Sequence, residues 1–364
     1  MSPNLNAFLP YLIAGICVVS TNKPTSIQNN LFPVEQHSTD LFTNDEILDI
    51  KLSGSLRELF DDRDKTPSYY PVTLSYITKD SIEVKIPIRM RTRGHFRRMR
   101  GNCDYPPLLL NFEKSGNHST LFENQNKIKL VTPCQSENYI FREWLVYKMY
   151  NLIEAKSFRT RLVRILCYDS KKKKELPSLY GILLEDDKEM AARNNMVMRE
   201  KGTRGEYTDR DTYLKMAMFQ YMIGNTDWSV PYLHNTKLIA ADSFTLPHAV
   251  PYDFDHAGIV EAHYAYPPQE LGLSSTKERR YRGYCLTNTK LFHDVLAIFK
   301  RHKIDFYKLY TNCQYLPARY IKSATKFLDD FYETINSPKK FAVATGRPCN
   351  KQYVDVVVKG LQSD

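Results

Sequence analysis

The sequence predicts an α+β fold with two lobes, a β-rich N-terminal lobe over residues 46–185 and a mostly helical C-terminal lobe over residues 186–350. Strand-length apolar runs separated by turn residues fill the first region, and apolar residues at helical spacing fill the second. The chain has 364 residues, of which 42% are hydrophobic, so it has enough material for both cores. We expect the first lobe to hold an antiparallel sheet and one helix.

Ahead of the lobes, the first twenty residues carry no charge and include the apolar stretch AFLPYLIAGICVVS. This pattern predicts a signal or lipoprotein segment over residues 1–20, with plain secretion and lipid attachment at Cys17 both open; a hydrophobic strand or helix is the alternative. Residues 21–45 have the Asn, Thr, Ser and Pro content of a flexible linker. We therefore expect an exported protein (periplasmic, secreted or an outer-membrane lipoprotein) that attaches to a membrane only through its N-terminus.

The β-rich lobe is read from six apolar runs and one helical stretch. The run at 82–93 alternates cleanly, with apolar residues such as Ile86 and Ile88 on one face and basic residues on the other. A helix is expected at about 137–153, where apolar residues recur at helical spacing. The other five runs lie at 71–78, 106–112, 127–131, 159–168 and 179–185.

The helical lobe follows Glu185. Helices are expected at 186–194, from Asp211 to a stop at Gly224, at 291–302, and from Ala318 to about Ile335. Residues 351–364 form a C-terminal tail. A β-rich lobe joined to a helical lobe is the layout of kinase-like folds.

Charge and cysteine content narrow the choice of partners. A formal net charge of +10 favours anions in general, and nucleotide phosphates, acidic lipid and nucleic acid all qualify. No basic motif interleaved with stacking aromatics is evident, so we expect no specific nucleic-acid partner. Six cysteines follow the N-terminal segment without any CxxC pair, and we expect buried free thiols and no zinc site, although an even number also permits disulfides.

The polar segment at 224–258 is the predicted chemical centre. Its order is a helix end, a polar loop, a strand, a turn and a second strand. If the turn lies near Phe244, Asn235 and Asp253 are side by side at the open end of the hairpin, close to Asp227. Converging carboxylate and amide oxygens suit Mg²⁺ or Mn²⁺, whose shell is completed by phosphate oxygens and water.

Phosphoryl transfer assigns these residues separate roles. Asp227 would be catalytic and orient the acceptor hydroxyl, whereas Asp253, Asn235 and Asp255 would hold the metal. Each has a structural alternative: Asp227 as a turn aspartate, Asn235 as a loop residue, and Asp253 and Asp255 as strand-end residues that face solvent. His95, His234 and His256 lie near these motifs without the spacing of a zinc site, and we expect them to be core or surface residues.

Five segments, in this order, carry a family resemblance: RTRGHFRR, FREWLVYKMYNL with SFRTRLVRI, YGILLEDDKEMAAR, GNTDW and PYDFDHAG. They resemble the RG turn, the helix and next strand, the GxYxxxE segment and the two acidic motifs of CotH-type kinases, atypical kinase-like proteins named for a bacterial spore-coat protein. GNTD is also similar to the HipA-type and lipid-kinase loops. The similarity extends over most of residues 85–260, and the whole chain resembles a group of uncharacterised exported Bacteroidetes proteins.

The resemblance implies a bilobal protein-kinase-like fold that binds ATP with Mg²⁺, or Mn²⁺, and phosphorylates a hydroxyl of a protein or small molecule. Lys129 or Lys127 would hold the phosphates, with Glu143 as the ion-pair partner and Arg93 as a substitute or assistant. Glu185 would lie between the lobes, near the adenine.

Departures from the family keep other functions open. A Gly-rich loop is absent, YPPLLLNF has no lysine, and Asp227 and Asn235 are eight residues apart, a longer spacing than in ordinary kinases. The missing Gly-rich loop and lysine favour a catalytically inactive pseudokinase that acts as a cell-envelope binding protein, and the longer spacing makes Asn235 a less secure metal ligand than Asp253. AMP transfer is a further alternative, because some kinase-like folds bind ATP reversed. The arginine-rich turn RMRTRGHFRRMRGN would lie over the phosphates or form a solvated hairpin.

Overall fold

The structure is a computed structural model that describes residues 41–113, 117–286 and 290–350. The expected N-terminal segment at 1–20 with Cys17, most of the linker at 21–45 and the tail at 351–364 lie outside these residues. In the described part of the chain, no helix is long and apolar enough to cross a membrane.

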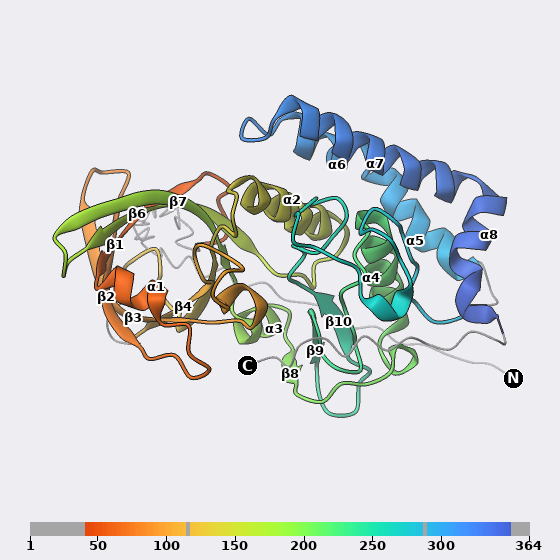
Figure 1. Ribbon diagram of the computed structural model, residues 1–364. Coiled ribbons are helices and arrows are strands. Elements are labelled where there is room, and N and C mark those ends of the chain that lie inside the picture. Colours follow the sequence, from red (N-terminus) through yellow and green to blue (C-terminus); the bar gives the residue numbers. More distant parts are fainter. Residues whose placement is uncertain (1–40, 114–116, 287–289, 351–364) are drawn as a thin grey trace, which may run out of the picture. The chain divides into compact units, whose positions relative to one another are not determined.

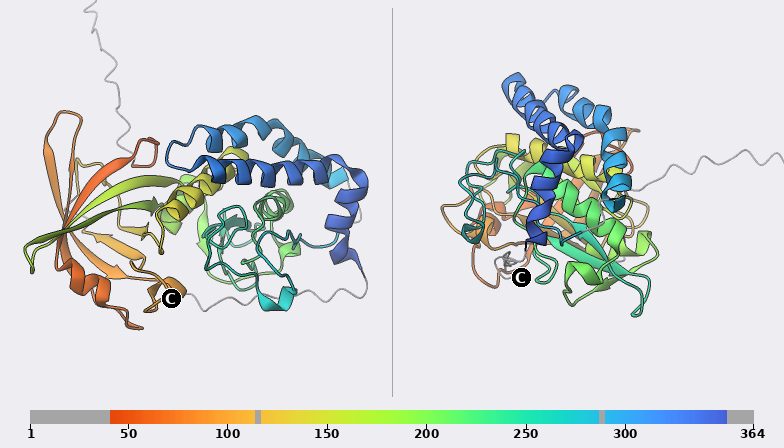
Figure 2. Two further views of the ribbon diagram at one scale, coloured as in Figure 1. Left: turned by 45° about the horizontal axis from the view of Figure 1, so that its top comes forward. Right: turned by 90° about the vertical axis from the view of Figure 1, so that its right-hand side faces the viewer.

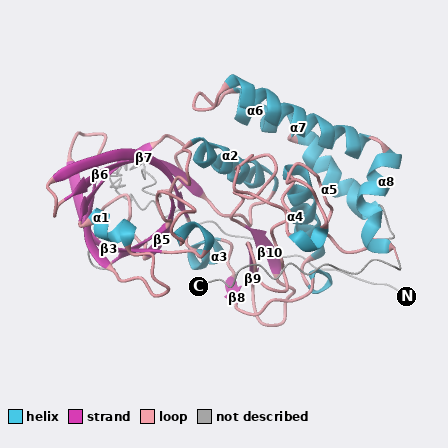
Figure 3. Cartoon of the chain, viewed as in Figure 1, coloured by secondary structure: helices cyan, strands magenta, loops and turns pink. Residues whose placement is uncertain are grey.

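Seven strands close into a barrel, which Figure 3 shows as a ring of magenta arrows. Around the barrel the order is β1-β2-β3-β4-β5-β7-β6, and all neighbours are antiparallel except β1 and β6, which run parallel and close the ring. The strands are β1 (Leu48–Gly54), β2 (Tyr70–Ile77), β3 (Glu83–Thr92), β4 (Leu108–Phe112), β5 (Lys127–Val131), β6 (Thr160–Asp169) and β7 (Lys174–Leu184).

The closed barrel overturns the expected bilobal, protein-kinase-like architecture, although the α+β class is confirmed. An antiparallel sheet with one helix was expected, whereas a short helix, α1 (Leu56–Asp61), also follows β1. The apolar pattern missed β1, the strand that closes the ring by pairing with β6 far along the chain. Alternation predicts that a segment forms a strand, but it does not predict which distant strand will be its partner.

Apolar side chains fill the interior of the barrel. On β3, Ile86, Ile88 and Met90 point inward and are buried, as the alternation predicts, while Pro87 and Arg89 between them are exposed. Helix α1 adds Leu56 and Leu59 to the same core. The barrel therefore has a hydrophobic core of its own.

A second core joins the remaining helices to a small sheet. Helix α2 contacts β6, β7, α4 and α6, and α7 packs against α6 and α8 (Figures 1 and 2). The helices are α2 (Asn138–Ile153), α3 (Asp187–Arg193), α4 (Arg210–Ile223), α5 (Lys290–Arg301), α6 (Lys303–Thr311), α7 (Ala318–Asn336) and α8 (Pro338–Gly346). The sheet has the order β10-β9-β8, with β8 (Val197–Arg199), β9 (Thr236–Ala240) and β10 (His248–Pro251). Short 3₁₀ helices are η1 (Phe96–Arg98), η2 (Gly205–Tyr207), η3 (Gln269–Leu271) and η4 (Arg347–Cys349).

Two disulfides contradict the expectation that the cysteines are free thiols. Cys103 is bonded to Cys134, and Cys285 is bonded to Cys349. Among the described cysteines only Cys167 and Cys313 are free. Structural disulfides form and persist in oxidising compartments, so this chemistry suits a protein outside the cytoplasm.

Candidate functional site

The loop that carries Asp227 begins where α4 ends. Gly224 ends the helix in the left-handed conformation, with φ of 69°. A Cβ on Gly224 would lie 2.9 Å from the Phe327 ring, so the position is closed to larger side chains. The backbone N–H of Gly258 donates to the Gly224 carbonyl oxygen, at 3.1 Å. The two acidic motifs are therefore tied together at the end of α4.

Asp227 is held by the two residues before β9. His234 Nε2 lies 2.8 Å from Asp227 Oδ1, and the Asn235 amide donates to Asp227 Oδ2 at 3.1 Å. Burial opposes ionisation of Asp227, but the hydrogen bond and charge of His234 outweigh it and lower the pKa of the carboxyl. Asp227 is therefore ionised and fixed in orientation.

The β9–β10 hairpin differs by one position from the expected register. Thr236 lies opposite Pro251, and the N–H of Tyr252 donates to the Asn235 carbonyl oxygen at 3.1 Å. The turn includes Phe244, as expected, but the residue that faces Asn235 is Tyr252 and not Asp253. The NH2 group of the Asn235 side chain donates to Asp227, and the metal-ligand role expected for its oxygen stays a prediction.

Asp253 leaves the strand with a left-handed backbone, φ 61°, and its N–H donates to Tyr147 Oη at 2.8 Å. Its half-buried carboxylate makes no hydrogen bond or ion pair with any residue that the structure describes. Burial and the neighbouring Asp255 raise the pKa of Asp253 to about 6. Asp255 is buried and accepts a hydrogen bond from Tyr264 Oη at 3.1 Å.

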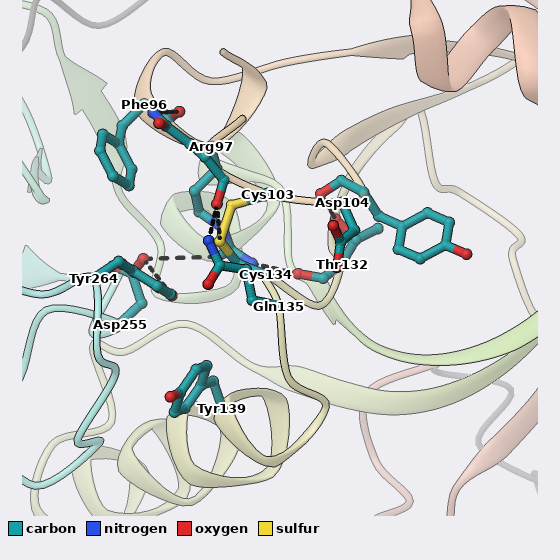
Figure 4. Close-up of a disulfide and its surroundings, with 12 residues drawn as sticks. Phe96, Arg97, Cys103, Asp104, Thr132, Cys134, Gln135, Tyr139, Asp255 and Tyr264 are labelled. Carbon is teal, nitrogen blue, oxygen red and sulfur yellow. Dashed lines mark hydrogen bonds and ion pairs between the residues drawn. A yellow bond between two sulfur atoms is a disulfide. The ribbon is translucent and has the colours of Figure 1, made fainter. Parts of the chain in front are cut away.

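Arg97 links these carboxylates to helix α2, as Figure 4 shows for Asp255. Its guanidinium lies 3.8 Å from Asp255 Oδ2 and 3.9 Å from Glu143 Oε2, and it donates to the Thr132 carbonyl oxygen. Burial alone would lower the pKa of Arg97, but the acidic groups around it outweigh burial and raise it. Arg97 is therefore a basic residue of the arginine-rich turn that forms ion pairs with an acidic motif and with α2.

Glu143 is buried on α2, and its Oε1 has no hydrogen-bond partner. Burial, followed by the charges of Asp255 and Asp253, raises the pKa of Glu143 well above its ordinary value. The expected ion pair between Glu143 and Lys129 is absent, because Glu143 faces Arg97 while Lys129 pairs with Asp187.

His256 lies among the same carboxylates. Burial would lower the pKa of this imidazole, but Asp255, Asp227 and Asp253 together raise it. Its ring also contacts Phe96, with ring centroids 6.2 Å apart. Of the histidines expected to be core or surface residues, His256 therefore lies among the carboxylates and His234 contacts Asp227.

The remaining expected ligands differ in position. Lys129 lies on the outer face of β5 beside Asp187, whereas Lys127, two residues earlier, is exposed. Arg93, which follows β3, is close enough to Asp253 to help hold its pKa down. Glu185 is buried and forms two hydrogen bonds with Arg193, at 2.9 and 3.0 Å, so its carboxylate is already occupied.

The number of carboxylates at this site fits a magnesium ion that also binds phosphate. Among the described residues, no group of three or more His, Cys, Asp or Glu side chains is placed to hold a metal ion. Mg²⁺ in phosphoryl-transfer sites uses one or two protein carboxylates and takes its other oxygens from phosphate and water. The unpaired Asp253 carboxylate, with Asp255 two residues on, supplies that number.

Comparison of the sequence with models of known protein families gives no match, and comparison with curated proteins gives none either. The resemblance to CotH-type kinases therefore rests on the motifs alone.

Sequence reasoning assigned no individual role in the site to four residues of this region. They are Arg97, Asp187, His234 and Lys237. His234 could have been found from its place directly before Asn235, and Arg97 from its place in RTRGHFRR. Asp187 and Lys237 gave no signal, because their partners come from other elements.

Proposed function

We propose that this protein is a phosphotransferase that uses Mg-ATP to modify a hydroxyl group. The observation that carries the proposal is the convergence of Asp227, Asp253 and Asp255 with Arg97 and His256. Such clusters of mutually perturbed ionisable groups are typical of functional sites. The proposal rests on this site and not on a kinase-like architecture.

Asp227 has the position and charge of the residue that orients the acceptor. Its carboxylate is ionised and held by His234 and Asn235, so it can accept the hydroxyl proton as the new bond forms. Asp253, with Asp255 beside it, would hold magnesium. Bound magnesium would neutralise charge on the β- and γ-phosphates.

Arg97 supplies a fixed positive charge at the carboxylates. It is 11% exposed and pre-oriented by Thr132, so it loses little freedom when an anion binds. The positive charge of the guanidinium also offsets the repulsion between the Glu143 and Asp255 carboxylates. It would stabilise negative charge that develops on the transferred group.

The first test concerns metal-dependent binding. We expect ATP with magnesium to raise the melting temperature of the wild type and to do so much less for Asp253→Asn, with an apparent affinity reduced at least about tenfold. The measurement is a thermal shift titration with and without magnesium. Failure of the wild type to respond to Mg-ATP would sink the proposal.

The second test separates chemistry from binding. Asp227→Asn should keep the Mg-ATP shift but reduce the transfer rate by roughly 10² to 10⁴-fold, because the acceptor loses its base. Mass spectrometry of modified acceptors would distinguish an added phosphate from an added AMP. Equal loss of binding and transfer would place Asp227 in nucleotide binding instead.

A specific observation also favours the pseudokinase alternative. Lys129 and Glu185, both expected to contact the nucleotide, are already paired with Asp187 and Arg193. A protein of this kind would bind an anion without transfer. Nucleotide binding by the wild type with no transfer to any acceptor is the result that this alternative expects.

We also propose that the protein works after export. The two disulfides and the uncharged apolar stretch at the N-terminus both support a periplasmic, secreted or outer-membrane lipoprotein location. An extracytoplasmic phosphotransferase needs a supply of nucleotide there. Fractionation of cells that express the full chain would test the location.

A further inference from the structure

Three basic residues from three elements gather beside the acidic cluster. Lys129 comes from β5, Lys237 from β9, and Arg93 follows the end of β3. The ammonium groups of Lys129 and Lys237 both lie over the aromatic ring of Tyr252, at 5.2 and 5.4 Å from its centroid. Tyr252 directly precedes Asp253, so this basic cluster borders the candidate metal residue.

One carboxylate is shared between the two lysines. Asp187 in the first turn of α3 pairs with Lys129 through Oδ1 and with Lys237 through Oδ2, at 3.1 Å for Lys237. Burial opposes ionisation of Asp187, but the two ammonium groups overcome it and lower the pKa of the carboxyl. Asp187 therefore stays ionised between the lysines.

The basic cluster has more positive than negative charge. Among the described residues, Asp187 is the only carboxylate that pairs with Lys129 or Lys237, and the Arg93 guanidinium forms no hydrogen bond or ion pair. Burial is the main cause that lowers the pKa of Lys129; Asp187 opposes this shift, and repulsion by Arg93 and Lys237 adds to it. Burial would also lower the pKa of Lys237, but Tyr252 and Asp187 outweigh burial and raise it. An added anion would relieve this repulsion.

We infer that Lys129, Lys237 and Arg93 form a binding site for a phosphate group, and that the Asp187 carboxylate occupies the place of this phosphate when the site is empty. Lys237 is the key residue, because it comes from β9 and yet shares the Asp187 carboxylate with Lys129 of the barrel strand β5. A phosphate bears more charge and more acceptor oxygens than one carboxylate, so it can engage both lysines and Arg93 together. The ligand class is a phosphate ester or anhydride.

This inference rests on the proposed function in one respect, since the phosphate would be that of the nucleotide. Its separate claim is that a phosphate replaces the Asp187 carboxylate between the two lysines. Removing the internal carboxylate should strengthen phosphate binding, whereas a purely structural Lys–Asp–Lys bridge predicts no such gain.

The experiment is isothermal titration calorimetry of the full chain without magnesium, with pyrophosphate, ATP, inorganic phosphate and adenosine as probes. We expect pyrophosphate and ATP to compete for one site and adenosine to leave it unoccupied. Lys237→Met should weaken pyrophosphate binding about tenfold, through loss of one charge-assisted contact. Asp187→Asn should strengthen it about tenfold. Lys85→Met, which removes an exposed lysine from β3, is the matched control and should change nothing.

Several results would overturn the inference. Pyrophosphate binding that is unchanged in Lys237→Met, or equal or weaker in a folded Asp187→Asn protein, contradicts it directly. Should Asp187→Asn fail to fold by circular dichroism, Lys237→Met and the competition titrations decide. Binding of adenosine without binding of pyrophosphate would show that the region recognises the nucleoside and not a phosphate group.

The two proposals can fail separately. If pyrophosphate binding depends on Lys237 but the protein has no transfer activity, the phosphotransferase proposal fails and the phosphate-site proposal stands. Transfer activity that depends on Asp253, in a protein whose pyrophosphate affinity ignores Lys237, would do the reverse.

Discussion

Asp253 combines a left-handed backbone, a half-buried carboxylate and a carboxylate neighbour two residues away. Burial and the neighbouring carboxylate make its ionised form costly in the absence of a cation. Positions of this kind persist where the surrounding structure enforces them, and they are concentrated at functional sites. The cost should be visible in the stability of the free protein.

The first prediction at this scale is a pH dependence of stability. The pKa of Asp253 is raised from an ordinary 3.8 to about 6, so between these values the folded protein binds more protons than the unfolded chain. The contribution of this residue to the free energy of unfolding therefore falls as pH rises from about 4 to about 6. Asp253→Asn should remove this fall and be more stable than the wild type at pH 7 by roughly 2–3 kcal/mol.

Urea unfolding of the metal-free proteins at several pH values provides the measurement. Wild type and Asp253→Asn should have similar stability near pH 4 and diverge above it. Parallel curves across the whole range would show that the carboxylate is not strained by its surroundings.

At the scale of elements, the Cys103–Cys134 disulfide fastens the segment after η1 to the residues that lead into α2 (Figure 4). Arg97 lies in η1 and donates to Thr132, two residues before Cys134. The Gln135 amide also donates to the Asn102 carbonyl oxygen, at 2.6 Å. The disulfide and these hydrogen bonds together orient Arg97 toward Asp255.

We predict that Cys134→Ser affects both stability and binding. The disulfide joins residues 31 apart, so its loss should lower the free energy of unfolding by about 3–4 kcal/mol. Arg97 should also become less ordered, and the apparent affinity for Mg-ATP should fall several-fold. Denaturant unfolding and thermal shift titration measure the two effects.

The second disulfide supplies the control. Cys285 and Cys349 are 64 residues apart and lie away from the acidic cluster in sequence, so Cys285→Ser should cost about 4 kcal/mol without changing Mg-ATP affinity. If both variants lose affinity equally, the effect on binding is one of general stability and not of Arg97.

At the scale of the whole molecule, the barrel provides a separately packed support for Lys129 and Arg97. We predict that Leu74→Ala, in the barrel interior, lowers the free energy of unfolding by about 2–5 kcal/mol, since Leu74 is fully buried. The Mg-ATP affinity of the folded fraction should be unchanged. A loss of affinity at temperatures where the variant is fully folded would instead show that packing inside the barrel adjusts the site.

Sequence patterns predicted the elements of this molecule better than their arrangement. The helix ending at Gly224, the helix over 138–153 and the alternation of β3 are set by neighbours in sequence, and all three are confirmed. Closure of the barrel by β1 and β6 depends on pairing between distant segments, and the bilobal prediction failed there.

The candidate site shows the same division. Asp227 and Asn235 are brought together by one loop, and sequence spacing indicated as much. Lys129 was expected to pair with Glu143, but Lys129 pairs with Asp187 and Glu143 pairs with Arg97. Which of several arginines or lysines meets a given carboxylate depends on the path of whole elements, and no local motif contains that information.

The disulfide beside Arg97 also has a consequence for timing. A chain made in a reducing cytoplasm, where ATP is plentiful, would lack this covalent tie until it reached an oxidising compartment. Under the proposed function, the newly made protein would thus meet ATP before Arg97 was held in place. Oxidation would then act as a maturation step, so that the chain gained full affinity only after leaving the place where premature modification of cytoplasmic molecules could do harm.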